Sequence, residues 1–223
     1  MKVITTTFLI LLCLTIMPLA VQASTILGIG TDKKLYTRSD LGSPWVKAPD
    51  KGGLVIGVTI MKNGTILGIG TDQKLYTRTN LNHSWVKAPD KGGRVTGVTI
   101  MKNGTILGIG MDQKLYTRSH LNSPWVKAPD KGGLVTGVTI MNNGSILGIG
   151  TDKKLYTRSN LNSPWVKAPD KGGLVIGVTI MNNGAILGIG TDLKLYTRTN
   201  LSSPWMKAPD KGGRVIAITI LYL

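Results

Sequence analysis

The chain has 223 residues, a formal net charge of +16 at pH 7 and a single cysteine, Cys13. One cysteine excludes a disulfide or a zinc–thiolate site within the chain. Every acidic residue is an aspartate, and the basic residues recur along the whole sequence instead of forming one tail. The positive field favours anionic partners such as acidic polysaccharide, lipopolysaccharide phosphates, a membrane surface or nucleic acid, although solubility alone would also explain it.

Residues 1–23 are typical of a secretory signal peptide. Lys2 precedes an apolar run from Phe8 to Ala20, and small residues end the segment at Ala23. The apolar run is too short for a comfortable transmembrane span. We therefore expect a secreted, extracellular protein (periplasmic if the source is Gram-negative) whose mature chain begins near Ser24, without a thiol or a transmembrane segment.

The remaining residues, 24–223, form five copies of a 40-residue unit with no spacer between them. The copies cover residues 25–64, 65–104, 105–144, 145–184 and 185–223. A phosphate-binding loop is not built five times in one small domain, so the Gly28-Ile29-Gly30 motif does not indicate a nucleotide site. We expect its glycines to lie in a strand where another group packs closely.

Each copy predicts four short strands. In the first copy they are residues 25–30 (TILGIG), 34–38 (KLYTR), 45–48 (WVKA) and 55–61 (VIGVTIM). Asn63-Gly64 predicts a two-residue hairpin turn with positive φ at both residues. The segments 39–44 and 50–53 are rich in turn-forming residues and predict loops.

Four strands repeated five times predict a single all-β domain, a five-bladed β-propeller with four antiparallel strands per blade. An open solenoid would need polar capping repeats, whereas the terminal copies here resemble the middle ones. We expect the last strand, residues 215–221, to be the innermost strand of the first blade, so that it pairs with residues 25–30 and closes the ring. A β-trefoil is disfavoured because it needs threefold repetition.

The order of motifs in each copy resembles that of the tectonin and tachylectin-type β-propeller lectins. The shared order is an apolar strand, an Asn-Gly turn, "ILGIGTD", "KLYTR", "PWVKAP" and "DKGG". The resemblance covers residues 24–223, and the blade count is that of the five-bladed tachylectin. It implies binding of N-acetylated sugars or bacterial envelope glycans at equivalent sites between blades. One departure is that the aromatic residue after the Gly-Gly pair is replaced, by Leu54, Arg94, Leu134, Leu174 and Arg214.

One tryptophan in each copy is a candidate for stacking on a sugar, although it could equally fill the gap between neighbouring blades. These residues are Trp45, Trp85, Trp125, Trp165 and Trp205. Tyr36 and its equivalents could serve either purpose.

The loop after each third strand supplies further candidates. Aspartate accepts hydrogen bonds from sugar hydroxyls, lysine can meet phosphate or carboxylate, and glycine exposes its backbone N–H. Turn capping by aspartate and positive φ at glycine are the structural alternative. The candidates are Asp50, Asp90, Asp130, Asp170, Asp210, Lys51, Lys91, Lys131, Lys171, Lys211, Gly53, Gly93, Gly133, Gly173 and Gly213.

An arginine ends each second strand and could grip an anion or stack on a tryptophan within the protein. These residues are Arg38, Arg78, Arg118, Arg158 and Arg198.

The chemistry of the chain argues against an enzyme. His83 and His120 are the only histidines, they occupy different positions of the repeat, and glutamate is absent. A histidine-based metal site or catalytic triad has no support, and equivalent sites in every blade disfavour a single active centre. We expect no cofactor.

We therefore expect a secreted, multivalent lectin that recognises N-acetylhexosamines, lipopolysaccharide or acidic polysaccharide. The alternative is a basic structural protein that coats an extracellular polymer without a sugar pocket. Nucleic acid is disfavoured as a partner because no nucleic-acid-binding module is recognisable. Whether the protein forms a homo-oligomer stays open.

Overall fold

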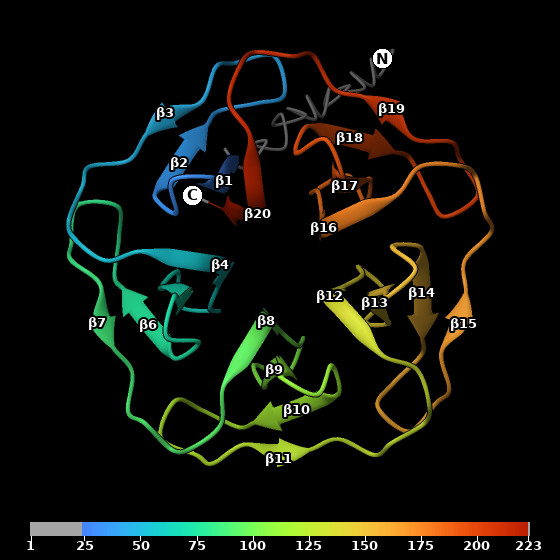
Figure 1. The fold of residues 1–223 in the computed structure, drawn as a ribbon, viewed down its shortest axis with the longest axis horizontal. Coiled ribbons are helices and arrows are strands. Elements are labelled where there is room, and N and C mark those ends of the chain that lie inside the picture. The colour runs from blue at the N-terminus through green and yellow to red at the C-terminus, as the bar shows by residue number, and fades with distance from the viewer. Residues whose placement is uncertain (1–23, 223) are drawn as a thin grey trace, which may run out of the picture.

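The computed structural model describes residues 24–222, so the predicted signal peptide and Cys13 lie outside the described residues. Five four-stranded antiparallel sheets surround a central axis like the blades of a propeller (Figure 1). The same sequence features produce every blade: segments with alternating apolar residues form the strands, and turn-forming Gly, Asn and Asp lie between the strands. The predicted all-β, five-bladed propeller is confirmed.

The first blade combines both ends of the described chain. From the axis outward it contains β20 (Val215–Tyr222), β1 (Ser24–Gly30), β2 (Leu35–Arg38) and β3 (Val46–Lys47). In the register of β1 and β20, Thr25 faces Leu221 and Leu27 faces Thr219. The predicted closure of the ring is therefore confirmed.

The other four blades each follow the chain directly from the innermost to the outermost strand. Blade 2 contains β4 (Val55–Ile60), β5 (Ile66–Gly70), β6 (Leu75–Arg78) and β7 (Val86–Lys87). Blade 3 contains β8 (Val95–Ile100), β9 (Ile106–Gly110), β10 (Leu115–Arg118) and β11 (Val126–Lys127). Blade 4 contains β12 (Val135–Ile140), β13 (Ile146–Gly150), β14 (Leu155–Arg158) and β15 (Val166–Lys167). Blade 5 contains β16 (Val175–Ile180), β17 (Ile186–Gly190), β18 (Leu195–Arg198) and β19 (Met206–Lys207).

One local prediction is wrong. In the hairpin between β4 and β5, only Gly64 has a positive φ, of 80°, and Asn63 does not. The Gly64 N–H donates to the Met61 carbonyl, while the Asn63 side chain accepts from the Thr65 N–H. Asn63 is thus selected for its capping oxygen, and Gly64 alone supplies the left-handed conformation.

The hydrophobic core is divided among the five interfaces between blades. In blade 3, Leu107 and Ile109 are fully buried against Val135, Val138 and the partly buried Trp165 of blade 4. Because side chains alternate along a strand, the intervening Gly108 points to the opposite side of β9. Each blade therefore presents an aliphatic surface to the next blade and a glycine-lined surface, covered by aromatic rings, to the previous one.

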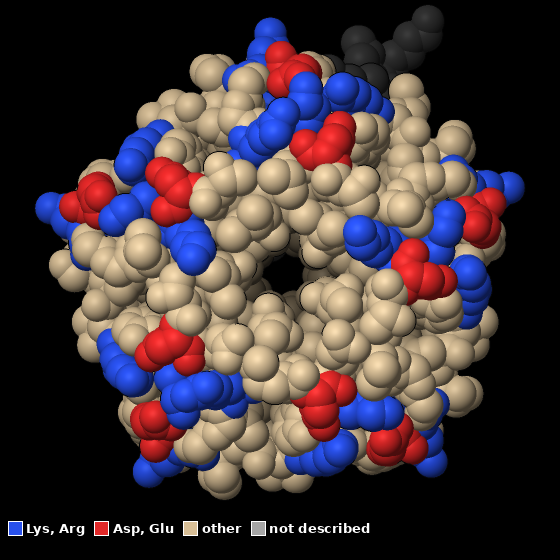
Figure 2. All heavy atoms as spheres, in the orientation of Figure 1, with Lys and Arg blue, Asp and Glu red and all other residues tan. Residues whose placement is uncertain are grey.

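On the face shown in Figure 2, acidic and basic side chains lie next to each other over every blade, and the surface immediately around the central opening carries no charged side chain. Two lysine–aspartate ion pairs recur near the turns at one end of the strands. In blade 1, they join Lys34 to Asp50 at 3.1 Å and Lys47 to Asp32 at 3.5 Å. On this face the charged groups are therefore spread around the disc rather than gathered in one patch.

Candidate functional site

A cavity of about 510 Å³ opens where blade 2 meets blade 3. An equivalent cavity of about 460 Å³ opens where blade 3 meets blade 4. Each cavity has two walls. One wall is the loop that connects the preceding blade to the blade that holds the cavity. The other wall is formed by a tyrosine and a tryptophan of that blade. The first is lined by Lys91, Gly92, Gly93, Arg94, Val95, Gly110, Met111, Asp112, Tyr116 and Trp125. The second is lined by Lys131, Gly132, Gly133, Leu134, Val135, Gly150, Thr151, Asp152, Tyr156 and Trp165.

Glycines set the position of the aromatic wall. A Cβ on Gly108 would lie 2.7 Å from Cη2 of Trp125, and one on Gly93 would lie 2.8 Å from its Cδ1. A Cβ on Gly110 would lie 2.6 Å from Cε2 of Tyr116. Both rings can therefore approach the backbone only because these residues are glycine. The two rings are left partly exposed at the cavity, where they offer an apolar surface with polar edges.

An aspartate fixes the turn that forms the floor of the cavity. Asp112 accepts from the Lys114 N–H at 3.1 Å and from the Tyr116 hydroxyl at 2.9 Å, and it pairs with Lys127 at 3.4 Å. Partial burial acts to raise the pKa of Asp112, but these hydrogen bonds outweigh it and the pKa is lowered. The carboxylate is thus ionised at neutral pH and holds the tyrosine hydroxyl in place.

The Gly-Gly loop is held from behind by a different aspartate. Gly92 and Gly93 have φ values of 79° and 72°, and Asp90 accepts from the Gly92 N–H at 3.1 Å. Asp90 also pairs with Lys74 at 3.0 Å, and this ion pair lowers its pKa. Its equivalent Asp130 lines only a crevice of about 10 Å³, on the other side of the loop from the open cavity. This space is at most that of one water molecule.

The strand-ending arginines lie inside the protein. Arg118 is 3% exposed, with its guanidinium 5.2 Å from the centre of the Trp125 ring. It donates to the carbonyls of His120 and Leu121. Burial lowers its pKa, while the charge of Asp90 in the previous blade opposes that effect. The arginine supports the tryptophan and the following loop, and it lines neither open cavity.

The structure therefore divides the predicted site residues into two groups. At the cavities of blades 3 and 4 it brings together the tryptophan, the lysine and the second glycine of the Gly-Gly pair. The same glycine–tryptophan contact recurs in the other blades, between Gly53 and Trp85, Gly173 and Trp205, and Gly213 and Trp45. The remaining candidates line neither cavity: each aspartate accepts from the N–H of the first glycine of the Gly-Gly pair, and each arginine is buried against a tryptophan. These are the aspartates at 50, 90, 130, 170 and 210 and the arginines at 38, 78, 118, 158 and 198.

From the sequence, the tyrosine of the site was left open between sugar stacking and packing, and the aspartate four residues before it was not selected. Asp112 and Tyr116 line the cavity of blade 3, and Asp152 and Tyr156 line that of blade 4, whereas Asp90 and Arg118 line neither. The sequence does contain a signal for this pair: in every copy an aspartate precedes a tyrosine by four residues, with a tight turn between them. That spacing allows the carboxylate to reach the hydroxyl across the turn, as it does in all five blades.

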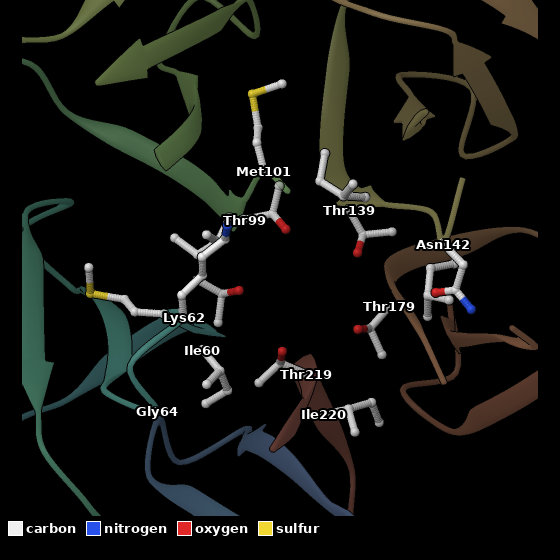
Figure 3. Close-up of a pocket in the computed structure, with 15 residues that line it drawn as sticks. Ile60, Lys62, Gly64, Thr99, Met101, Thr139, Asn142, Thr179, Thr219 and Ile220 are labelled. Atoms are coloured by element: carbon white, nitrogen blue, oxygen red, sulfur yellow. The ribbon is translucent and has the colours of Figure 1, made fainter. Parts of the chain in front are cut away.

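A separate channel of about 400 Å³ follows the axis of the ring. One threonine from each innermost strand lines it, and each is 7% exposed; the four that Figure 3 labels, Thr99, Thr139, Thr179 and Thr219, point towards the axis. The five are Thr59, Thr99, Thr139, Thr179 and Thr219. Isoleucines and methionines complete the lining, with Lys62 and Asn142. Because its lining contains no aromatic ring, the channel lacks the stacking surface that the cavities between blades provide.

Two further properties of residues 24–222 bear on function. No group of three or more His, Cys, Asp or Glu side chains in this part of the chain could hold a metal ion. This part also contains no helix with the length and apolar character needed to cross a membrane.

A family model described as the tectonin domain matches residues 16–203. Among curated proteins, none matches the chain in sequence.

Solved structures share the fold at low identity. One is a putative gluconolactonase, 9% identical with a TM-score of 0.59 over 89% of this chain and 81% of that chain. Another is a gluconolactonase from Xanthomonas campestris, 9% identical with a TM-score of 0.58 over 86% of this chain and 77% of that one. A third is a symmetrical protein of de novo evolutionary emergence, 15% identical with a TM-score of 0.53 over 87% and 93% of the two chains. At these identities the similarity shows the propeller fold alone.

Proposed function

Because the chain belongs to the tectonin domain family and forms a lectin-like β-propeller, we propose that it is a secreted, non-enzymatic lectin with up to five near-equivalent sugar sites. The observation that carries the proposal is the cavity between blades, where Trp125, Tyr116 and the Gly92-Gly93 loop meet. Its ligands would be N-acetylated sugars or bacterial envelope glycans.

Each group at the cavity matches a part of such a sugar. The exposed parts of the indole and phenol rings can pack against the C–H groups of a pyranose ring. The glycine loop exposes backbone N–H groups, which can donate to an acetamido carbonyl or an anionic oxygen. Lys91 adds a charged donor at the rim. Aromatic surfaces with a few fixed polar groups are typical of small-ligand sites.

Repetition compensates for the shallow form of each site. Open cavities of this kind bind one sugar weakly, but several rigidly spaced sites can engage one glycan-bearing surface. Simultaneous binding raises the overall affinity by about 10² to 10⁴-fold over that of one site. The ligand is therefore expected to be a multivalent surface rather than a free monosaccharide.

Blocking the cavities one at a time tests the proposal. Thr151 is exposed at the rim of the blade 4 cavity, and the equivalent position in blade 3 carries Met111, so a large side chain is tolerated there. We expect Thr151→Trp to remove one sugar site and the fivefold tryptophan variant at positions 31, 71, 111, 151 and 191 to remove all binding to envelope glycans. Val166→Thr is the matched control, because Val166 is 61% exposed on an outer strand and is not part of the cavity lining.

The net positive charge of +16 favours a second candidate, a basic protein that coats an anionic polymer without sugar pockets. Charge-driven association weakens as ionic strength rises. Sugar recognition instead persists in salt and is inhibited by free N-acetylhexosamine. Binding that is lost in salt, insensitive to free sugar and unchanged in the fivefold tryptophan variant would replace the lectin proposal with this one.

A further inference from the structure

The cavities of blades 3 and 4 differ in charge at one rim position; their other difference, Met111 against Thr151, involves only uncharged side chains. The residue after the Gly-Gly pair is Arg94 in the first cavity and Leu134 in the second. The lysine, the two glycines, the aspartate, the tyrosine and the tryptophan are the same in both. Over the whole chain, this position is arginine in two copies and leucine in three: Arg94 and Arg214 against Leu54, Leu134 and Leu174.

Arg94 is exposed at the rim, and the aspartates near it are already paired. Asp112, on the cavity floor, is engaged by Lys127, and Asp90, behind the loop, is engaged by Lys74. None of the ion pairs found within residues 24–222 involves Arg94 or Arg214. The guanidinium is therefore available to an anion that enters the cavity.

We propose that Arg94 and Arg214 make two of the five sites selective for sugars that carry an anionic oxygen group, namely phosphate, sulfate or carboxylate. The three leucine sites select neutral sugars. This inference rests on the proposed lectin function and assigns two ligand classes to its sites.

The chemistry of the two side chains supports the division. A guanidinium is planar and weakly hydrated, and it can bind two oxygens of one anionic group at once. Leu134 is 42% exposed at the same position and offers only apolar contact. Lys91 and Lys131 line their cavities equally, so lysine cannot produce the difference. The selectivity is therefore assigned to the arginine.

The two arginine sites are separated by one leucine site. Arg94 precedes β8 in blade 3 and Arg214 precedes β20 in blade 1, with blade 2 and its Leu54 between them.

The five tryptophans provide a site-resolved test, because each blade contains one. Their indole N–H signals can be followed by NMR during titration of the full mature chain, after assignment with single Trp→Phe variants. The probes are N-acetylglucosamine, its 6-phosphate, its 6-sulfate and N-acetylmuramic acid. For the acidic sugars we expect the signals of Trp45 and Trp125 to respond at about tenfold lower concentration than the other three, with a gain that shrinks as ionic strength rises.

Two variants complete the experiment. In Arg94→Leu/Arg214→Leu, the signals of Trp45 and Trp125 should lose their gain for acidic sugars, so that all five signals respond to these sugars at the same concentration. In Leu134→Arg, Trp165 should join the acid-selective group. A response to only one of the three anionic groups would support the inference and identify that group.

The failures are distinguishable. If N-acetylglucosamine shifts the indole signals but acidic sugars show no arginine-dependent gain, the inference is overturned and the lectin proposal stands. If no sugar shifts any indole signal, both are overturned.

Discussion

The indole of Trp125 lies against the backbone of Gly108, so closely that a Cβ there would lie 2.7 Å from Cη2 of the ring. The ring cannot retreat, because Arg118 stacks on it and Gly93 of the entering loop contacts its other end. The same contact joins Gly28 to Trp45, Gly68 to Trp85, Gly148 to Trp165 and Gly188 to Trp205. The first glycine of each ILGIG strand thus leaves the space that the tryptophan ring of the same blade occupies.

Replacing that glycine should therefore strain the core. We expect Gly108→Ala to lower the free energy of unfolding by about 1–3 kcal/mol, the usual cost of overpacking. Urea denaturation followed by tryptophan fluorescence measures it. Gly42→Asn is the matched control, because the equivalent positions in blades 2, 3 and 4 carry asparagine, and it should change stability by less than about 0.5 kcal/mol. If both variants changed the free energy of unfolding equally, the close contact between Gly108 and Trp125 would not be the cause of the loss.

Removing the buried arginine should lower the stability of the fold. Arg118→Met leaves the carbonyls of His120 and Leu121 without their charged donor, and we expect a loss of about 2 kcal/mol or more in unfolding free energy. Arg94→Leu removes the same charge from an exposed position where three other copies carry leucine, so its stability should match that of the parent chain. If thermal unfolding showed similar losses of stability in the two variants, the effect would come from removing a positive charge and not from the buried hydrogen bonds of Arg118.

The pH dependence of stability should be a broad plateau with two limits. All eleven aspartates have a pKa lowered from the ordinary 3.8. A lowered folded-state pKa contributes stability that is present above pH 3.8 and is lost as the pH falls further. The five tyrosines that donate to these turns have a pKa raised above 10.0, so their contribution is present below pH 10.0 and is lost as the pH rises through the folded-state value.

Differential scanning calorimetry across pH checks this expectation. The Tm should be nearly constant between about pH 5 and 9 and should fall on both sides. Tyr116→Phe removes one hydroxyl and should reduce the alkaline loss while leaving the acid limb almost unchanged. An alkaline limb that is identical in this variant would show that the tyrosine hydroxyls do not contribute.

Closure of the ring by β20 should be indispensable. Truncation after Gly213 removes β20, leaves β1 as an unpaired edge and uncovers the apolar surface of blade 1. We expect this variant to lose its cooperative thermal transition and to aggregate. A circular permutant provides the control: Asn-Gly joins Tyr222 to Thr25, as in the hairpins of the other blades, and new ends are opened between Asp40 and Gly42. It should melt cooperatively, near the Tm of the parent; a truncated chain that does the same would refute the role of β20.

Much of the fold could be predicted because its information is local and repeated. Alternation in LYTR and the turn residues around it define strands within a few residues, and the period of 40 defines the blade. The third strand was predicted over 45–48 but covers only Val46–Lys47, because Trp45 turns into the interface between blades. The φ of Asn63 was mistaken because Asn-Gly is compatible with more than one hairpin geometry.

The site was predictable only in part. The tryptophans and the Gly-Gly loops were identified as chemical groups, but Arg118 and Asp90 looked equally suitable. Strand alternation places Arg118 and Tyr116 on the same side of β10, and it does not say which of them the neighbouring blade will cover. Only contact with the previous blade buries Arg118 and leaves Tyr116 at the opening.

The sequence by itself therefore determined the repeating sheet, the number of blades and the strand that closes the ring, since each follows from periodicity and from hydrogen bonding that every strand must satisfy. The tertiary structure decided where a ligand could bind. Each cavity is shared between the loop of one repeat and the aromatic rings of the next, so neither repeat contains it alone. Its form depends on how two surfaces pack, and packing is a property of the closed ring rather than of any segment.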